Sequence, residues 1–237
     1  MPEDLIKPSC DRKVRGYSVQ KNTYGLLPGP EGTCPGATVG AGGCRDITGN
    51  GRPACYVYKI MRIYSGVRRI LEHNTALLKG ADMATMADLL GSEFTRFQAD
   101  TLARNGKGML RYRLHWAGDL FSMDYARALR TAVDAHPDVF FWTYTRSFDY
   151  MGPLLGAPNL RLYVSADMCN LKEAMAAHRA AGGKASMCYM GDSAPALPGL
   201  RFTACPVDKG SMQLEGACFK CGMCLKGIPV FFETKRG

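Results

Sequence analysis

The chain has 237 residues, of which 30 are Lys or Arg and 21 are Asp or Glu, and its formal net charge is +9. Hydrophobic residues make up 46% and charged residues 22%, a globular composition that excludes a wholly disordered chain. No apolar run approaches the roughly 20 residues of a membrane helix, and the start MPEDLIKPSC lacks the basic end and apolar stretch of a signal peptide. We therefore expect a soluble, cytoplasmic protein without membrane contact.

The first quarter of the chain differs from the rest in composition. Residues 1–56 are rich in Gly, Pro and Cys and carry little helical periodicity. Glycine recurs every few residues from Asn22 to Arg52, and a loop of that length in a compact domain is usually functional. We divide the chain into a loop region over 1–56 that belongs to the core domain, an α/β core over 57–204, and a C-terminal cysteine segment over 205–237.

The next block, residues 56–105, carries two apolar stripes at helical spacing, which predict two helices separated near Gly80. The first stripe contains Ile60, Ile63, Val67, Ile70 and Leu71, and the second contains Met86, Leu89, Leu90, Phe94 and Phe97.

From residue 109 onward, short strands alternate with helices. The predicted strands lie within 109–119, where the strand ends in a turn, and within 139–147, 160–167, 185–192 and 200–208. The predicted helices cover 122–136, with Ser122 as the N-cap, and 171–183, closed by Gly182 and Gly183. This alternation indicates a mostly parallel sheet with right-handed crossovers, as in a partial (βα) barrel or an open α/β sheet.

Polar residues follow the predicted strands, at the edge where proteins of this class bind ligands. They include Asp119, Arg146, Ser165, Asp167 and Asp192. Turns favour such residues in any protein, so each alone is weak evidence. His115 lies four residues before Asp119, and on one strand the two side chains would share a face. We take this pair as the candidate catalytic residues, for acid–base chemistry or for holding a substrate.

The strongest local motif lies near the C-terminus. Cys218, Cys221 and Cys224 have the spacing C-x2-C-x2-C, and Cys205, followed by proline, lies thirteen positions upstream of the first of them. Four thiolates are the usual ligand set of a [4Fe–4S] cluster or a structural zinc ion. We predict a metal centre on these four cysteines, and we favour iron–sulfur over zinc.

A second cysteine set lies in the glycine-rich loop. Nine residues separate Cys34 from Cys44 and ten separate Cys44 from Cys55, so the loop must wrap to bring the thiols together. Seven glycines between residues 32 and 51 ease that wrapping, because glycine tolerates positive φ. Three thiolates suit a cluster with one open iron. Alternatively, Cys10, Cys169 or Cys188 supplies a fourth ligand and closes the site. Neither nucleotide-binding glycine fingerprint is present.

Three segments together resemble a known family: CPGATVGAGGC…ACYVYK, RLHWAGDLFSMDYARALRTAVDAHPDVFFWTYTRS, and CP…C-x2-CGMC. They resemble the "gene product 88" family of bacteriophage proteins over residues 22–226. Along the chain, a cysteine loop comes first, and strands ending AGD, YTRS and VSAD follow it. This order of segments is also similar to that of the radical S-adenosylmethionine (SAM) enzymes. That similarity implies an open cluster on Cys34, Cys44 and Cys55 and an auxiliary C-terminal cluster. It places SAM near Gly118 and Asp119, and the further strand ends with Ser165 and Asp167 complete the candidate cofactor-binding set.

These observations leave three functions open. The first is an iron–sulfur enzyme of the radical SAM type, which needs an electron donor and acts on DNA, RNA or a nucleotide-derived substrate in the host cytoplasm. The second is a zinc-containing base-exchange enzyme similar to the guanine transglycosylases, with Asp119 as nucleophile. The third is a non-enzymatic nucleic-acid-binding module that uses metal for folding. The net charge of +9 permits a polyanionic partner in each case.

Overall fold

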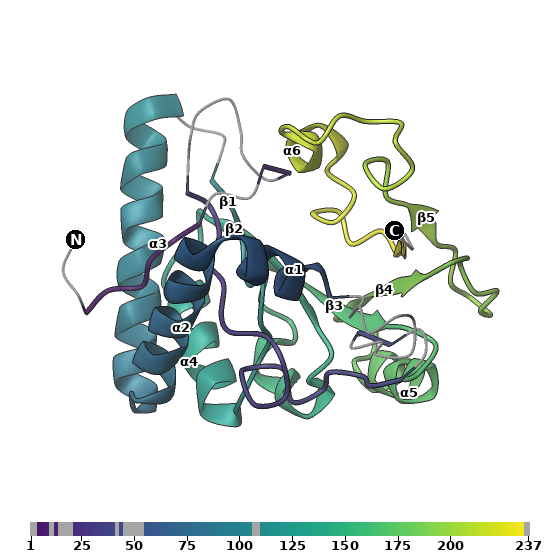
Figure 1. Ribbon diagram of the computed structural model, residues 1–237, viewed down its shortest axis with the longest axis horizontal. Coiled ribbons are helices and arrows are strands. Elements are labelled where there is room, and N and C mark those ends of the chain that lie inside the picture. Colours follow the sequence, from purple (N-terminus) through teal and green to yellow (C-terminus); the bar gives the residue numbers. More distant parts are fainter. Residues whose placement is uncertain are drawn as a thin grey trace.

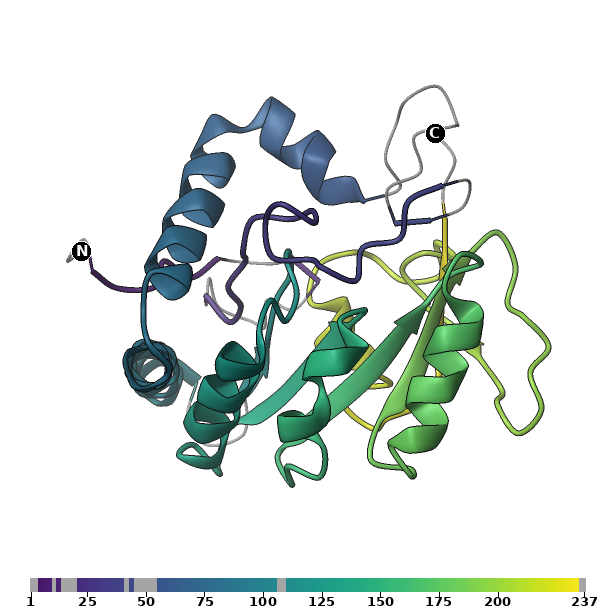
Figure 2. The ribbon, with the colours of Figure 1, turned by 90° about the horizontal axis from the view of Figure 1, so that it is seen from below.

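The computed structural model describes residues 4–9, 12–13, 21–40, 43–44, 55–105 and 110–234. Its centre is one six-stranded sheet in which every pair of neighbours is parallel, with the order β1-β2-β3-β4-β6-β5. The sheet curls into a half barrel, with helices packed against its outer face (Figures 1 and 2). The predicted α/β class and the partial barrel of parallel strands are therefore confirmed.

The strands follow the alternation of the sequence. They are β1 (Arg111–Arg113), β2 (Phe140–Thr145), β3 (Leu160–Ala166), β4 (Ser186–Gly191), β5 (Thr203–Ala204) and β6 (Val230–Glu233). Along β2 and β3, alternate side chains such as Phe141, Leu162 and Val164 point outward and join the main hydrophobic core. Their neighbours, including Tyr144 and Tyr163, point to the concave inner face.

The longer helices cover the outer face and one edge, and a short sixth helix lies in the C-terminal segment. They are α1 (Tyr56–Ile63), α2 (Ser65–Lys79), α3 (Met83–Asn105), α4 (Met123–Asp134), α5 (Leu171–Ala180) and the short α6 (Ala217–Cys221), with one-turn 3-10 helices at Phe148–Tyr150 and Gly152–Leu154. Figure 2 shows α4 and α5 on the outer side of the sheet. No helix in the described ranges is long and apolar enough to cross a membrane.

The first helical block differs in part from its prediction. The chain breaks once more, at Tyr64, whose extended backbone (φ −118°, ψ 97°) separates α1 from α2. The predicted first stripe is wrong at Ile63, which is 57% exposed, because the buried face of α1 contains Val57 and Met61 instead. The second stripe is confirmed, since its members in α3 are buried in the main core, apart from half-buried Leu89.

Helix boundaries downstream match the sequence closely. The Ser122 hydroxyl accepts a hydrogen bond of 3.1 Å from the Tyr125 N–H, which confirms the N-cap of α4. Helix α5 ends just before Gly182 and Gly183, whose φ values of 56° and 80° are left-handed.

Two predicted strands are shorter than expected. The predicted strand over 109–119 ends at Arg113, because His115 has a left-handed φ of 54° that no strand accommodates. The predicted strand over 200–208 is reduced to the two residues of β5, and the strand beside β4 is the unpredicted β6.

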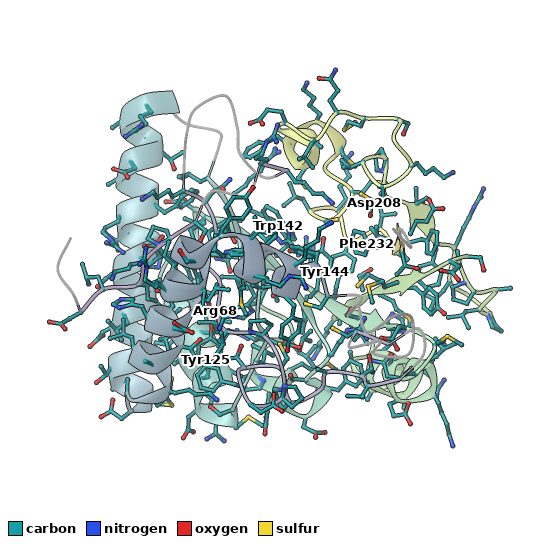
Figure 3. The ribbon with its side chains drawn as sticks, in the orientation of Figure 1. Arg68, Tyr125, Trp142, Tyr144, Asp208 and Phe232 are labelled. Atoms are coloured by element: carbon teal, nitrogen blue, oxygen red, sulfur yellow. The ribbon has the colours of Figure 1, made fainter. Side chains whose placement is uncertain are left out.

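Two long segments complete the half barrel. The N-terminal segment runs beside the end of β1 and is held there by backbone hydrogen bonds. The Arg113 N–H donates to the Asn22 carbonyl and the Trp116 N–H to the Tyr24 carbonyl. In the other direction, the Leu26 N–H donates to the Ala117 carbonyl. The C-terminal segment, residues 205–229, crosses the inner face, where the Tyr163 hydroxyl donates to Ile228 (2.9 Å) and the Ser186 hydroxyl to Gly227 (2.8 Å). Figure 3 labels Trp142, Tyr144 and Phe232, and the rings of Tyr144 and Phe232 meet edge to face with their centroids 5.6 Å apart.

Candidate functional site

The structure brings the three N-terminal cysteines together at the carboxyl edge of the sheet. The Cys55 N–H donates to the Cys44 carbonyl at 2.9 Å, and the two thiols share a hydrogen bond. Cys34 lies close enough to both for their charges to interact. All three side chains are partly buried. The loop therefore wraps as its spacing requires.

The three thiols differ in their ease of ionisation. Burial, with the nearby Asp119 carboxylate, raises the pKa of Cys34 to about 12. The hydrogen bond from Cys55, aided by the Arg146 guanidinium, lowers the pKa of Cys44. The same hydrogen bond and burial raise the pKa of Cys55. Cys44 is therefore the thiol of this group whose surroundings favour the thiolate, the form that binds metal.

A buried ion pair ties the loop to the strand ends. Asp167, which follows β3 and is fully buried, accepts from the Arg146 guanidinium at 2.5 Å and from the Thr38 hydroxyl at 2.6 Å. Thr38 in turn accepts from the Cys44 N–H at 2.7 Å. The second Asp167 oxygen accepts from the Cys169 N–H at 2.8 Å. This linkage fixes the position of Cys44 relative to β2 and β3.

Asp119 joins the ends of β1 and β2. Its carboxylate accepts from the Arg146 N–H and from the Leu120 N–H, each at 2.7 Å, and burial raises its pKa. Gly118 before it has a φ of 83°, and a Cβ there would lie 2.5 Å from the Thr33 hydroxyl oxygen. Gly118 therefore lets the cysteine loop approach this edge closely, and Asp119 stays near Cys34 and Cys44.

His115 lies in other surroundings, which overturns the prediction that it shares a strand face with Asp119. Its Nε2 is 2.6 Å from the Tyr125 hydroxyl and 3.1 Å from the Tyr24 hydroxyl, and these two hydroxyls are 2.5 Å apart. Burial lowers the pKa of His115 to about 3. Because the strand stops at Arg113, the imidazole turns into this tyrosine network, and the proposed His115–Asp119 pair does not form.

The other predicted cofactor residues also divide between two places. Asp167 adjoins the cysteine loop, whereas the Ser165 hydroxyl points to the inner face and bonds the buried Cys188 thiol. Of the candidate fourth ligands, Cys169 lies beside the loop, its sulfur 3.2 Å from the position of a Cβ on Gly43. Cys188 lies between the two cysteine groups, close to both Arg146 and Cys224. Cys10 is outside the described residues.

The C-terminal cysteines lie on the inner face. Cys224 interacts electrostatically with Cys205 and Cys221, and burial raises its pKa. The Tyr144 hydroxyl donates a hydrogen bond to the Cys224 sulfur, a contact that no sequence motif indicates. The Cys218 N–H donates to the Lys13 carbonyl at 2.8 Å, so an N-terminal residue helps position this group.

Among the described residues, no three His, Cys, Asp or Glu side chains are arranged to hold a metal ion. The chemistry of the donors still suits iron–sulfur ligation, because a cluster of several irons spreads its thiolates more widely than one ion does. The metal centres predicted from the sequence therefore stay predictions.

The fold and the site together define a class: a half barrel of parallel strands with one cysteine group at its carboxyl edge and another on its inner face. This chain belongs to the gene product 88 family, whose model matches residues 4–227. It is 31% identical to the "Gene 88 protein" of Mycobacterium phage L5 over 251 residues, and 31% identical to that of Mycobacterium phage D29 over 253 residues. Each alignment covers 98% of this chain and 98% of the relative. No solved structure matches the chain. The family resemblance found in the motifs is thus confirmed.

Proposed function

We propose that this protein is an iron–sulfur enzyme of the radical SAM type that acts on nucleic acid or on a nucleotide-derived substrate. One observation carries the proposal: Cys34, Cys44 and Cys55, far apart in the sequence, gather at the carboxyl edge of a parallel half barrel. Ligands of α/β proteins bind at that edge, because loops from successive strands meet there.

The residues around these thiols suit an anionic iron–sulfur group. A [4Fe–4S] cluster supplies one-electron chemistry when bound, with SAM as co-substrate and an external electron donor. Arg146 offers positive charge beside Cys44 and favours its thiolate. Asp119 and Asp167 are the nearby carboxylates that would orient the amino group of a bound amino acid. Both already accept hydrogen bonds from the scaffold, which holds them in place.

The C-terminal group, Cys205, Cys218, Cys221 and Cys224, is the proposed site of a second [4Fe–4S] cluster, with zinc as the alternative. In this proposal, its four thiolates leave no open position and Tyr144 donates a hydrogen bond to one sulfur. Such a hydrogen bond tunes the reduction potential of a cluster, so the group would serve electron transfer or stability, and the N-terminal group would serve chemistry.

The test is metal and sulfide analysis, with a visible absorption spectrum, on protein purified without oxygen. Two clusters would give about eight irons with matching sulfide, and replacing Cys34, Cys44 and Cys55 together with serine would halve both. The matched control is Cys169→Ser, an exposed cysteine whose loss leaves three N-terminal ligands. SAM cleavage by the reduced wild-type protein, absent from the triple variant, would complete the case.

Other outcomes would overturn the proposal. One zinc and no iron would favour the base-exchange enzyme, and loss of base exchange in Asp119→Asn would then support it. Zinc without any catalytic activity would leave a metal-stabilised nucleic-acid-binding protein.

A further inference from the structure

The outer surface of α1 and α2 exposes basic side chains and large apolar or aromatic side chains that take no part in the core. Residues 56–71 contain four basic side chains and no acidic one. The residues of this stretch that the fold buries lie on the opposite side: Val57, Met61 and Leu71. We call the exposed set Lys59, Arg62, Ile63, Tyr64, Arg68 and Arg69 the α1–α2 patch.

The charges of the patch are not neutralised within the described structure. None of Lys59, Arg62, Arg68 and Arg69 forms a salt bridge with another described residue, unlike Arg96, Arg127 and Arg130 elsewhere on the helices. The N-terminus of α2 adds to the positive potential, because Tyr64 provides no side-chain cap and the first turn has no acidic residue. The patch therefore presents four exposed cations that form no salt bridge with another described residue.

The patch also exposes apolar and aromatic area between its charges. Ile63 is 57% exposed and Tyr64 is 60% exposed, because the extended backbone at Tyr64 turns the chain outward between the two helices. Large side chains at such exposure, interleaved with arginine and lysine, are typical of surfaces that bind a partner.

The patch adjoins the cysteine group at the carboxyl edge. Helix α1 begins at the residue after Cys55, and the Tyr56 hydroxyl donates to the Trp116 carbonyl at 2.6 Å, just before Gly118 and Asp119. Figures 1 and 2 show α1 and α2 arching beside the N-terminal segment, and Figure 3 marks Arg68 on α2. A chain lying along the patch would therefore pass beside the candidate site.

We propose that the α1–α2 patch binds single-stranded nucleic acid and guides it to the cysteine site. Four cations can pair with successive phosphates, and the exposed Tyr64 ring offers a face on which a base can stack. An anionic membrane is the weaker fit, because α1 has eight residues and the patch has one aliphatic side chain, whereas interfacial helices bury a broad apolar face. The site of chemistry rests on the proposed function, but binding itself does not require a cluster.

The test measures binding of a fluorescent 12-nucleotide single strand by anisotropy. With four phosphate contacts, wild-type affinity should fall about 50-fold between 50 and 200 mM salt. The variant Lys59→Gln/Arg62→Gln/Arg68→Gln/Arg69→Gln should bind weakly and lose most of that salt dependence. Tyr64→Ala should bind about tenfold more weakly with an unchanged salt dependence, because stacking is not ionic.

The matched control removes the same four charges elsewhere, in Arg104→Gln/Lys172→Gln/Arg179→Gln/Lys184→Gln, whose positions on α3, α5 and the following turn are exposed. Circular dichroism, melting temperature and iron content are measured on every variant. Equal weakening in the control, or wild-type-like binding by the patch variant, overturns the inference. The inference is also overturned if the wild-type protein binds phosphatidylglycerol vesicles or an acidic protein more tightly than the oligonucleotide. Iron-loaded protein that binds no strand overturns this inference alone, whereas iron-free protein that binds it overturns the proposed function alone.

Discussion

The two cysteine regions are held in place by different kinds of interaction. The N-terminal loop is tied to the sheet by polar groups, above all the buried Arg146–Asp167 pair that Thr38 joins to Cys44. The C-terminal segment receives hydrogen bonds from Tyr163 and Ser186, and it is also held by apolar packing in which its own sulfurs take part. Cys205 and Cys224 pack with Tyr163 and Val230.

In the N-terminal region, the groups that hold the loop in place are mostly different from the thiols that could react. In the C-terminal region, the same thiols take part in both roles. The thiols of Cys34 and Cys44 are not anchors of the N-terminal loop, whereas Cys55 packs in an apolar cluster with Val57, Met61 and Leu71. The loop can therefore keep its place while Cys34 and Cys44 change protonation or bind a ligand. In the C-terminal segment the thiols belong to the packing, so a change at sulfur is a change in stability. The first arrangement suits a reactive site, and the second suits a structural or electron-transfer centre.

The experiment with the largest expected effect compares how much stability the protein loses when each cysteine group is replaced. Replacing Cys205, Cys218, Cys221 and Cys224 with serine should lower the free energy of unfolding by about 5 kcal/mol or more, because it removes partly buried sulfur and any metal that stabilises the segment. Replacing Cys34, Cys44 and Cys55 should cost less than half as much. Urea denaturation followed by circular dichroism measures both, and equal losses would erase the distinction between the regions.

The sequence predicted the fold better than the site. The short apolar and aromatic runs of β2 and β3 and the Ser122 cap are local signals, and such signals located most elements correctly. The end of β1 and strand β6 depend on tertiary contacts. His115 takes a left-handed backbone at a bend against the N-terminal segment, and the short β6 is stabilised by insertion between β4 and β5.

At the site, the cysteines and strand-end acids were visible as residue types at informative spacing. Their connections were not visible, because Thr38 and Arg146 are 108 positions apart and meet only once the loop has folded. The donation from Tyr144 to Cys224 was hidden for the same reason. The spacing of cysteines can predict a set of metal ligands. Which carboxylate lies beside which thiol depends on long-range hydrogen bonds that the spacing does not reveal.

A second experiment asks whether the ion pair is the anchor of the N-terminal loop. The side chains of Arg146 and Asp167 are 10% and 0% exposed, so Arg146→Met leaves a carboxylate buried without its partner. The expected loss is about 3–5 kcal/mol, measured by urea denaturation. The matched control is Arg127→Met, which breaks a pair with exposures of 59% and 64% and should cost at most about 0.5 kcal/mol. Similar losses in the two variants would argue against a buried electrostatic anchor.

A third experiment compares one glycine from each region. A Cβ on Gly36 would lie 2.1 Å from the Arg146 carbonyl oxygen, a backbone atom that cannot move aside, so Gly36→Ala should push the loop off β2 and cost about 2 kcal/mol. Gly222 meets nothing within 4 Å and has a φ of 65°, so Gly222→Ala should cost only about 1 kcal/mol of backbone strain. Thiol labelling should rise for Cys44 in Gly36→Ala and stay unchanged in Gly222→Ala. A Gly36→Ala protein that labels like wild type would show that the loop is held elsewhere.

The experiment with the smallest expected effect concerns His115, whose imidazole lies 3.1 Å from the hydroxyl of Tyr24 in the N-terminal segment. The folded-state pKa of His115 is about 3, below its ordinary value of 6.5, so the unfolded chain binds more protons between these values. Stability should therefore fall on acidification, by roughly 1.5 kcal/mol from pH 6.5 to pH 5 through this group. His115→Gln should remove that part of the pH dependence, whereas His178→Gln, at a half-buried position on α5, should keep nearly all of it. Because the wild type and His115→Gln share every other titrating group, the difference between their two pH profiles isolates His115. Identical profiles would mean that the imidazole is protonated within the fold and free for acid–base chemistry.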